Sequence, residues 1–410
     1  MNYKYIIVGG GIAGTTAAEA IRTADKTGSL AIISDEQYRL YSRIMLSKPN
    51  FFLEKIPFEN VWLKKEEWYS ANNVAFMPGK KAVALDTSVR TITLDDGNVL
   101  TYEKLLLAPG GAARKFPGPG GDKGGIFVIR SLDDAKGIIA KTKTAKKAIV
   151  IGGGFVSFEM CEMLRMAGVD VTLLLREKIF WEILLDETSG QIIEDALIKG
   201  GVKILREAEV AEFLGDASIT GAKLKDGTLL ECDMAIVGIG IVMNLDWIKS
   251  AGIETNRGII ANEYLETSAK DVWVAGDTAE FNDLILGERV QLGNWVNAQM
   301  QGRTAGNAMT GKHEAFRLVS FYTTQGFETA IAFAGDVRVD KERVVITRGS
   351  HELKSYSRLI TWNGRIIGAT LINRTQDLAP ISKLIEKGVI ITGKEEQIKN
   401  PAFNLSELLK

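Results

Sequence analysis

The sequence predicts an α/β protein with two similar three-layer domains, each built on a parallel sheet, and a smaller α+β domain after them. Three observations predict this class. The chain has 410 residues, which exceeds one ordinary core. A strand, glycine-turn and helix pattern occurs twice, with its first glycines 143 residues apart. The region after Ser320 alternates apolar and polar residues, as half-buried strands do.

Composition and charge exclude several classes of protein. Hydrophobic residues make up 46% and charged residues 25% of the chain, so disorder, collagen and coiled coil do not describe it as a whole. Lys+Arg 50 against Asp+Glu 51 gives a net charge of -1, which provides no general basic field for nucleic acid or an anionic membrane. The N-terminus shows no targeting pattern, and no early apolar stretch reaches the ~20 residues of a membrane span. We therefore expect a soluble, cytoplasmic protein.

The first glycine turn predicts a phosphate-binding site near the N-terminus. A strand at Tyr5–Val8 leads into Gly9-Gly10-Gly11-Ile12-Ala13-Gly14, and a helical pattern follows through Ile21. In such a unit the first glycine permits the tight turn, and the second lets the backbone approach a pyrophosphate at the helix N-terminus. The third small residue lets the helix lie close to the strand. These roles assign cofactor contacts to Gly9, Gly11 and Gly14, and Ala13 lies in the same turn.

The second glycine turn repeats this arrangement. A strand at Ala148–Ile151 precedes Gly152-Gly153-Gly154-Phe155-Val156-Ser157, and a helical pattern runs from Glu159 to Met166. Ser157 stands at the third small position. One glycine motif is weak evidence, whereas two in the same context and a domain apart predict two Rossmann-like dinucleotide-binding domains.

In each copy, the residues that follow the second strand indicate which nucleotide binds. In the first copy a strand at Leu30–Ser34 ends at Asp35 and Glu36, whose carboxylates can accept hydrogen bonds from ribose hydroxyls. In the second copy the strand Val171–Leu175 ends at Arg176, and the expected acid is missing. An arginine there can accommodate a 2′-phosphate, or it can be a solvated charge at a strand end. NADH and NADPH therefore both remain open.

With both turns in place, the chain resembles the FAD- and NAD(P)-dependent pyridine nucleotide-disulfide oxidoreductase superfamily. Leu105–Gly111 resembles the strand and turn that close the first FAD segment, with Pro109 where threonine is usual. Asp271–Asp277 resembles the second FAD motif, and Asn294–Gln299 resembles the flavin-facing helix. The resemblance covers nearly the whole chain. It implies an FAD-binding domain at 1–112 and 243–318, an NAD(P)-binding domain at 113–242 and a C-terminal α+β domain at 319–410.

Cysteine use separates this chain from the thiol-using members of the superfamily. Members that reduce disulfides carry a close cysteine pair early and a His–Glu dyad late, and neither occurs here. Other members carry one cysteine after the ribose acid, but the segment Tyr38–Lys48 has none. Cys161 lies in a predicted helix and Cys232 opens an apolar strand, so we interpret both as buried, inert thiols.

The segment Tyr41–Lys48 resembles the Tyr-x-Arg-x-x-Leu-Ser-Lys block of the rubredoxin/ferredoxin reductase and nitrite-reductase-like branch. In that branch the lysine lies near the reactive flavin nitrogen and pairs with a glutamate on the NAD(P) helix, positions that Lys48 and Glu159 match. Ser320–Gln325 matches an aromatic flavin-covering motif, with Tyr322 in place of tryptophan and Thr324 in place of aspartate.

The resemblance implies Lys48 and Glu159 as catalytic residues. With only two cysteines and two histidines in the chain, we expect no metal site. The resemblance also implies transfer of electrons from NADH or NADPH through FAD to a small iron–sulfur or rubredoxin-type protein, with a homodimer possible. Alternatives are an NAD(P)H oxidase or diaphorase, an electron-input subunit of a nitrite-reductase-like system, and a flavin-bound redox sensor. The implied cofactor-binding residues are Gly9, Gly11, Ala13, Gly14, Asp35, Glu36, Arg43, Lys48, Val83, Ala108, Gly110, Arg130, Gly152, Gly154, Phe155, Val156, Glu159, Arg176, Gly240, Asp277, Asn294, Trp295 and Tyr322.

Overall fold

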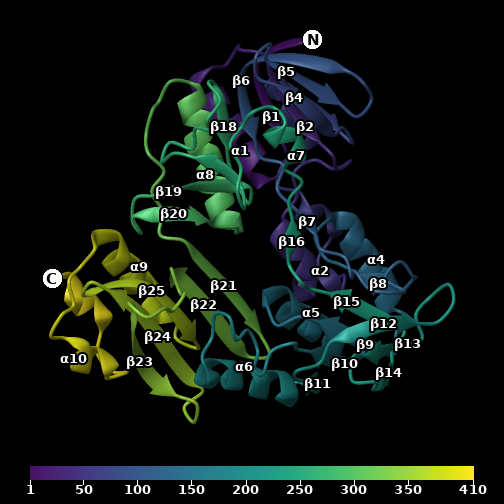
Figure 1. The fold of residues 1–410 in the computed structure, drawn as a ribbon, viewed down its shortest axis with the longest axis vertical. Helices are drawn as coiled ribbons and strands as arrows, with labels where there is room; N and C mark the ends of the chain where they lie inside the picture. Colours follow the sequence, from purple (N-terminus) through teal and green to yellow (C-terminus); the bar gives the residue numbers. More distant parts are fainter. The chain divides into compact units, whose positions relative to one another are not determined.

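The computed structural model describes residues 1–410 and divides into two compact units (Figure 1). Unit 1 comprises Met1–Ser42, Glu59–Ala112 and Val242–Ser320, and unit 2 comprises Arg43–Phe58, Ala113–Ile241 and Phe321–Lys410. None of the helices combines the length and the apolar character that crossing a membrane requires.

Unit 1 is built on a seven-stranded sheet with the order β3-β2-β1-β6-β5-β4, in which β18 also pairs with β6. The central strands β1, β2, β3, β6 and β18 run parallel, so their carboxyl ends meet at one edge. All five residues of β2 are buried, as expected for a parallel strand covered on both faces. The strands are β1 (Asn2–Val8), β2 (Leu30–Ser34), β3 (Val74–Pro78), β4 (Ala82–Asp86), β5 (Thr91–Leu94), β6 (Val99–Leu107) and β18 (Val272–Val274).

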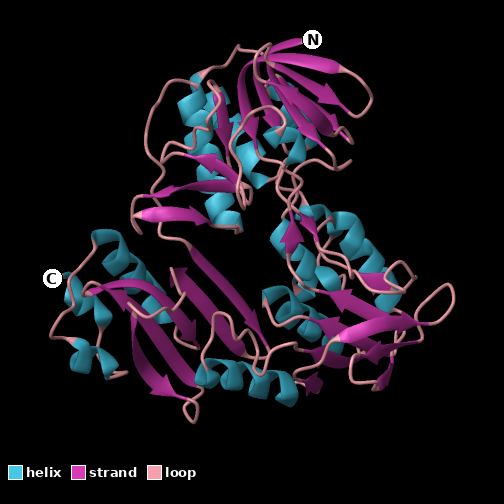
Figure 2. Cartoon of the chain, in the orientation of Figure 1, coloured by secondary structure: helices cyan, strands magenta, loops and turns pink.

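Helices α1 and α8 pack closely against each other in unit 1 (Figure 2). Glycines permit this approach, because a Cβ built on Gly302 would lie 2.1 Å from the carbonyl oxygen of Ala13, and one on Gly306 would lie 2.5 Å from that of Ala17. A small sheet, β17-β19-β20, completes the unit. The elements are α1 (Ile12–Ala24), α3 (Glu66–Ala71), α7 (Asp246–Lys249), α8 (Trp295–Met309), β17 (Ile259–Ala261), β19 (Ala279–Asp283) and β20 (Glu288–Gln291).

Unit 2 contains the second parallel sheet, with the order β11-β10-β9-β15-β8, and a three-stranded antiparallel sheet, β12-β13-β14. Val150 of β9 lies opposite Leu173 of β10 and Ile236 of β15. The elements are α2 (Pro49–Phe52), β8 (Ile126–Phe127), α4 (Leu132–Thr142), β9 (Lys147–Ile151), α5 (Phe155–Met166), β10 (Asp170–Leu174), α6 (Glu187–Lys199), β11 (Val202–Leu205), β12 (Val210–Leu214), β13 (Gly221–Leu224), β14 (Leu229–Glu231) and β15 (Met234–Val237).

The C-terminal part of unit 2 has the predicted α+β character. Its five strands form an antiparallel sheet with the order β21-β22-β25-β24-β23, and two helices follow. Two short strands, β7 (Ala112–Ala113) and β16 (Ile241–Val242), lie where the chain passes between units. The other elements are β21 (Phe321–Gly326), β22 (Thr329–Gly335), β23 (Val344–Ser350), β24 (Ser355–Trp362), β25 (Arg365–Ile372), α9 (Leu378–Lys387) and α10 (Glu395–Lys399).

Residues 43–58 differ from the sequence-based assignment. From the sequence they are predicted to belong to the FAD-binding segment 1–112, whereas in the structure Arg43–Phe58 groups with unit 2. The physical reason is packing: Phe52 is buried in the hydrophobic core of unit 2, and Lys48 forms an ion pair with Glu159 of α5. The division into three domains stays a prediction.

Candidate active site

The first glycine turn forms an open cradle at the N-terminus of α1. Gly9 has a φ of +116°, and a Cβ built on it would lie 2.0 Å from the carbonyl oxygen of Ala108. A Cβ on Gly14 would lie 1.9 Å from the carbonyl oxygen of Gly9, so both positions exclude larger side chains. Gly11 caps the helix, has no neighbouring atom within 4 Å of its built Cβ, and leaves the first N–H groups without a side-chain cap. This geometry suits a phosphate.

The two predicted ribose acids follow β2 directly. Asp35 is exposed, and Glu36 is half-buried and accepts a hydrogen bond of 2.5 Å from the hydroxyl of Tyr41. Because β1 and β2 are parallel neighbours, the acids and the glycine turn stand at the same edge of the sheet. Val83, also predicted to contact the cofactor, is exposed on β4 of the same sheet.

The second FAD motif ends at the same edge of unit 1. Strand β18 pairs with β6 and leads into Gly276, which has a φ of +84°, and then into Asp277. The Gly276 N–H donates a hydrogen bond of 2.7 Å to Oε1 of Gln301 on α8. Among the remaining predicted residues, Ala108 is buried after β6, Gly110 has a φ of +65°, Asn294 caps α8 and Trp295 begins it.

Helix α8 carries two buried polar side chains, Asn297 and Gln301, that are not among the residues predicted from the sequence. The Nε2 of Gln301 and the Oδ1 of Asn297 are buried and have no hydrogen-bond partner in the chain. Buried polar groups normally find one. These orphaned atoms, the open glycine cradle and the carboxylates together fit a dinucleotide with hydroxyl and phosphate groups. In the sequence, Asn297 and Gln301 stand among the small residues of the buried face of α8, and this pattern is the signal that could have identified them as cofactor contacts.

The second glycine turn has the same geometry in unit 2. Gly152 has a φ of +112°, and its built Cβ would lie 2.3 Å from the carbonyl oxygen of Gly238. Gly154 caps α5 without a side-chain hydrogen bond, and Phe155 and Val156 begin the helix. Ser157 is fully buried at the third small position. This turn therefore offers a second set of uncapped N–H groups for an anion.

Glu159 of α5 is a buried carboxylate held by three donors. The Nζ of Lys48 lies 2.5 Å and the Oγ1 of Thr324 lies 2.6 Å from its Oε1, and the hydroxyl of Ser47 donates to its Oε2. The glutamate side chain is 7% exposed and the lysine side chain 37% exposed, so the positive charge that compensates the carboxylate remains accessible. The structure thus brings the two predicted catalytic residues together, and Ser47 and Thr324 are partners that sequence reasoning did not assign.

Four aromatic rings gather at the start of α5. The Phe155 ring centroid lies 3.8 Å from that of Tyr322, 4.4 Å from that of Trp181 and 5.4 Å from that of Phe333. Burial, and secondarily the charge of Glu159, raise the pKa of the Tyr322 hydroxyl above its ordinary range. Phe155 and Tyr322 are predicted cofactor contacts from the sequence, and the rings of Trp181 and Phe333, which the sequence does not single out, pack against Phe155.

Among the remaining predicted residues of unit 2, Arg176 and Gly240 are exposed, whereas Arg43 and Arg130 are half-buried. Arg176 is 69% exposed and pairs with Glu177 at 3.0 Å, while Leu175 is buried. Arg43 donates a hydrogen bond of 2.5 Å to the carbonyl oxygen of Arg130. Gly240 is exposed with a φ of +98°.

Neither cysteine is placed for redox chemistry. Cys161 and Cys232 are free and buried, and desolvation raises the pKa of both thiols, that of Cys232 to about 12. Thiolates are the reactive form, so both side chains are inert at neutral pH. No group of three or more His, Cys, Asp or Glu side chains could hold a metal ion.

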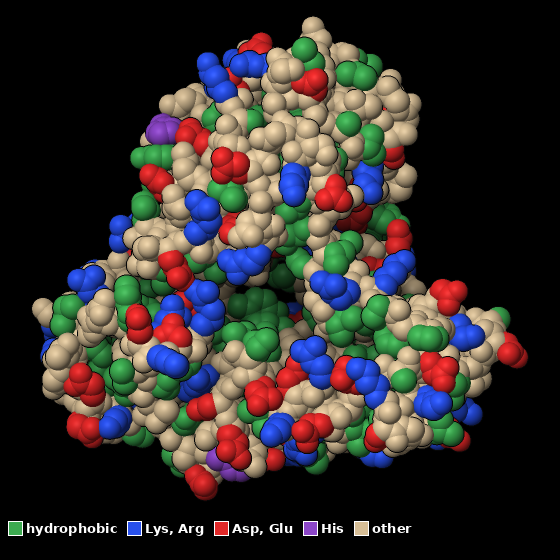
Figure 3. Space-filling model, viewed as in Figure 1, with side chains coloured by type: hydrophobic (Ala, Val, Ile, Leu, Met, Phe, Trp, Pro, Cys, Tyr) green, Lys and Arg blue, Asp and Glu red, His purple; other side chains and the backbone are tan.

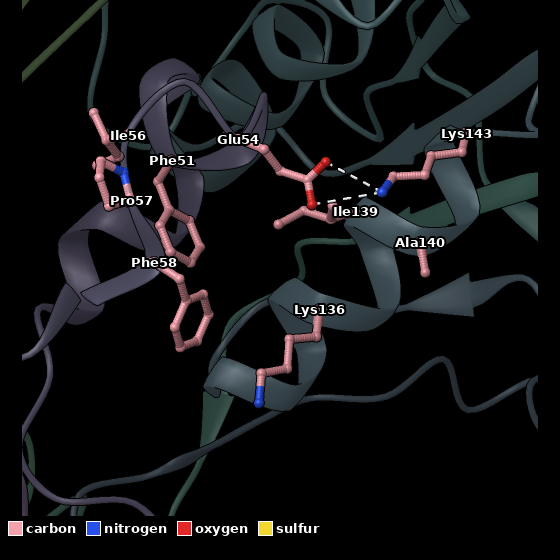
Figure 4. A pocket seen from close by; sticks show the side chains of 9 residues that line it. All are labelled: Phe51, Glu54, Ile56, Pro57, Phe58, Lys136, Ile139, Ala140 and Lys143. Atoms are coloured by element: carbon pink, nitrogen blue, oxygen red, sulfur yellow. Dashed lines mark hydrogen bonds and ion pairs between the residues drawn. The ribbon is translucent and has the colours of Figure 1, made fainter. Parts of the chain in front are cut away.

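A pocket of about 430 Å³ lies between α2 and α4 in unit 2 (Figure 4). It is mainly apolar, and Glu54 and Lys143 form an ion pair of 3.1 Å on one side of it. It contains none of the predicted site residues. Its lining residues are Phe51, Glu54, Ile56, Pro57, Phe58, Lys136, Ile139, Ala140 and Lys143.

Residues 3–302 match the family described as pyridine nucleotide-disulphide oxidoreductase. The chain belongs to this family. This match confirms the superfamily predicted from the sequence. The solved structures described below confirm the α/β fold class, and the named relatives confirm that the chain is an oxidoreductase.

Several named members of the pyridine nucleotide-disulphide oxidoreductase family are similar along much of the chain. The ferredoxin reductase subunit of a 5,5'-dehydrodivanillate O-demethylase from a Sphingobium species is 30% identical over 94% of both chains. The NADH-rubredoxin oxidoreductase of Clostridium acetobutylicum is 31% identical over 76% of both. The nitrite reductase [NAD(P)H] of Bacillus subtilis is 29% identical over 94% of this chain, which spans about half, 47%, of that protein.

Solved structures show the same fold. The NADH:rubredoxin oxidoreductase of Clostridium acetobutylicum superposes with a TM-score of 0.80 at 26% identity, covering 96% of this chain and 97% of that one. A chain of the covalent putidaredoxin reductase–putidaredoxin complex gives a TM-score of 0.92 at 24% identity, covering 100% and 98%.

Proposed function

We propose that this chain is an FAD-dependent NAD(P)H oxidoreductase that passes electrons to a small iron–sulfur or rubredoxin-type protein. The proposal rests on the two open glycine turns, one in each unit. Both cysteines of the chain are buried, so no thiol is available to take part in the reaction. Relatives named as ferredoxin and rubredoxin reductases support the type of acceptor.

FAD supplies the chemistry that joins a two-electron donor to a one-electron acceptor, because a flavin accepts a hydride and releases electrons singly. The N-terminus of α1 and Gly11 would hold its pyrophosphate, and Asp35 or Glu36 its ribose hydroxyls. Asp277 would bind the sugar chain. The N-terminus of α8, capped by Asn294, would favour negative charge on the reduced cofactor.

The second glycine turn would bind the nicotinamide nucleotide through the N-terminus of α5, with Phe155 and Tyr322 covering the nicotinamide. Glu159 would hold the Lys48 ammonium in one orientation, and a fixed ammonium favours negative charge on a neighbouring group. The position of Lys48 beside the flavin is implied by the resemblance and stays a prediction.

With no accessible thiol to relay electrons, the acceptor would have to take them directly from the flavin. The face shown in Figure 3 mixes positive and negative side chains, and the net charge of the chain is -1. Weak electron-transfer complexes use small contact areas. We therefore expect docking to depend on a local arrangement of charges. A cytoplasmic location and a homodimer stay predictions.

Anaerobic titration of the flavin-loaded protein tests the proposal. We expect NADH or NADPH to bleach the flavin spectrum at one two-electron equivalent per FAD, and a rubredoxin or ferredoxin to reoxidise it faster than oxygen does. Uptake of a second equivalent with a long-wavelength thiolate-to-flavin band would contradict the thiol-independent route.

An electron-input role in a nitrite-reductase-like system is the second candidate, favoured by the Bacillus subtilis relative. Rapid turnover with a nitrite-reducing partner, and none with rubredoxin or ferredoxin, would select it.

A further inference from the structure

We propose that Trp181 is a nucleotide-binding residue of the second glycine turn, and that its indole forms the wall against which the pyrophosphate and the adjoining ribose of NAD(P)H pack. This inference rests on the proposed function, because it assumes that the turn binds a nicotinamide nucleotide. The second glycine turn, Trp181 and the aromatic rings around it all belong to unit 2.

Trp181 lies directly against the turn. A Cβ built on Gly153 would lie 3.1 Å from the Trp181 main-chain nitrogen, and one built on Gly154 would lie 4.0 Å from its indole Cε2. Gly154 is the glycine where the backbone approaches a pyrophosphate, and it is the residue that precedes the uncapped N–H groups of α5. Any anion bound at this turn would therefore be a neighbour of the indole.

The tryptophan is held in an unusual backbone conformation. Its φ is +55°, a region that bulky L-residues rarely adopt and that tends to occur at functional sites. The preceding residue anchors it, because Phe180 is fully buried and its N–H donates a hydrogen bond of 2.7 Å to Oε1 of Glu194. The N–H groups of Leu184 and Leu185 donate to the Trp181 carbonyl oxygen at 2.9 and 3.0 Å.

The indole ring is supported on its sides and remains partly exposed. Its plane is nearly perpendicular to the rings of Phe155, at 86°, and Phe333, at 75°. The residue is half-buried, and its indole N–H donates no hydrogen bond within the chain. An indole in this place can pack on a sugar and donate to a phosphate oxygen.

Calorimetric binding of ADP-ribose to the FAD-loaded protein tests this, because ADP-ribose carries the pyrophosphate and both riboses but cannot be oxidised or reduced by the flavin. Trp181→Asn removes the indole with a residue that tolerates a positive φ. Trp181→Phe keeps a ring without the N–H. Trp362→Phe, at the end of β24, is the matched control.

We expect Trp181→Asn to raise the Kd for ADP-ribose about tenfold, Trp181→Phe to raise it about threefold, and Trp362→Phe to leave it unchanged. AMP, which lacks the second phosphate and ribose, should bind the wild type and Trp181→Asn equally. An unchanged Kd for ADP-ribose in Trp181→Asn, or an equal loss with AMP, would overturn the assignment. Failure of the wild type to bind ADP-ribose would instead contradict the proposed function.

Discussion

The Oγ1 of Thr324 donates a hydrogen bond of 2.6 Å to the Oε1 of Glu159, although 165 residues separate them in the sequence. The threonine lies on β21 of the C-terminal sheet and the glutamate on α5. The same carboxylate oxygen accepts the Lys48 ammonium. One strand of the C-terminal part thus fixes the side chain that orients the predicted catalytic lysine.

We expect Thr324→Val to slow flavin reduction by NAD(P)H about tenfold and to lower the free energy of unfolding by about 1–3 kcal/mol, because a buried carboxylate loses one of its donors. Stopped-flow reduction and urea denaturation measure the two effects. Thr324→Ser keeps the hydroxyl and should restore most of both. Equal rates in the valine variant and the wild type would show that Thr324 does not position Glu159.

Gly9 and Gly11 should respond differently to alanine. A Cβ at Gly9 meets the backbone of Ala108, so Gly9→Ala should destabilise unit 1 even without cofactor. A Cβ at Gly11 meets no protein atom, so Gly11→Ala should fold with unchanged thermal stability in the FAD-free form. It should nevertheless retain much less FAD, because the methyl group occupies the space of the pyrophosphate.

Flavin content per chain, with melting temperatures of the FAD-free proteins, checks this pair. Full flavin content in Gly11→Ala would show that the FAD pyrophosphate does not bind at the first glycine turn.

Arg176 should decide between NADH and NADPH. Arg176→Glu should lower kcat/KM for NADPH relative to NADH about tenfold, because a carboxylate repels a 2′-phosphate. Glu177→Gln removes the partner of Arg176 and should shift the same ratio toward NADPH. Steady-state kinetics with both nucleotides gives the ratio, and a ratio that stays constant in both variants would leave Arg176 as a solvated charge.

Alkaline pH should destabilise the fold through its buried thiols. The ordinary pKa of a cysteine thiol is 9.0, and burial raises the pKa of Cys232 to about 12. Between these values the unfolded chain loses the proton while the folded chain keeps it. The stability that the neutral thiol contributes is therefore present below pH 9.0 and lost as the pH rises toward about 12.

Urea denaturation at pH values from about 8 to about 11 measures this loss, and Cys232→Ala should make the pH dependence shallower. Thiol reagents should modify neither cysteine of the folded protein at neutral pH. Rapid labelling of Cys232 before unfolding would contradict the burial argument.

The sequence predicts the local part of this architecture well. Glycine turns, the strands before them and the helices after them are set by short-range steric needs, so Gly9 and Gly152 were readable from the pattern alone. The partners of Glu159 were less readable: the resemblance supplied Lys48, but nothing local connects Ser47 or Thr324 to α5. Trp181 was missed because its position follows from a backbone φ that hydrophobic periodicity does not encode.

The discontinuous composition of unit 1 has a consequence for biosynthesis. Strand β18 completes the sheet beside β6, and Gly302 and Gly306 seat α8 against α1, nearly 300 residues after that helix begins. A chain emerging from the ribosome therefore cannot close its first dinucleotide fold until most of its length has been translated. Until then the apolar faces of β1 and α1 lack their final cover, so we expect nascent chains of this protein to depend on chaperones and to retain FAD only late in synthesis.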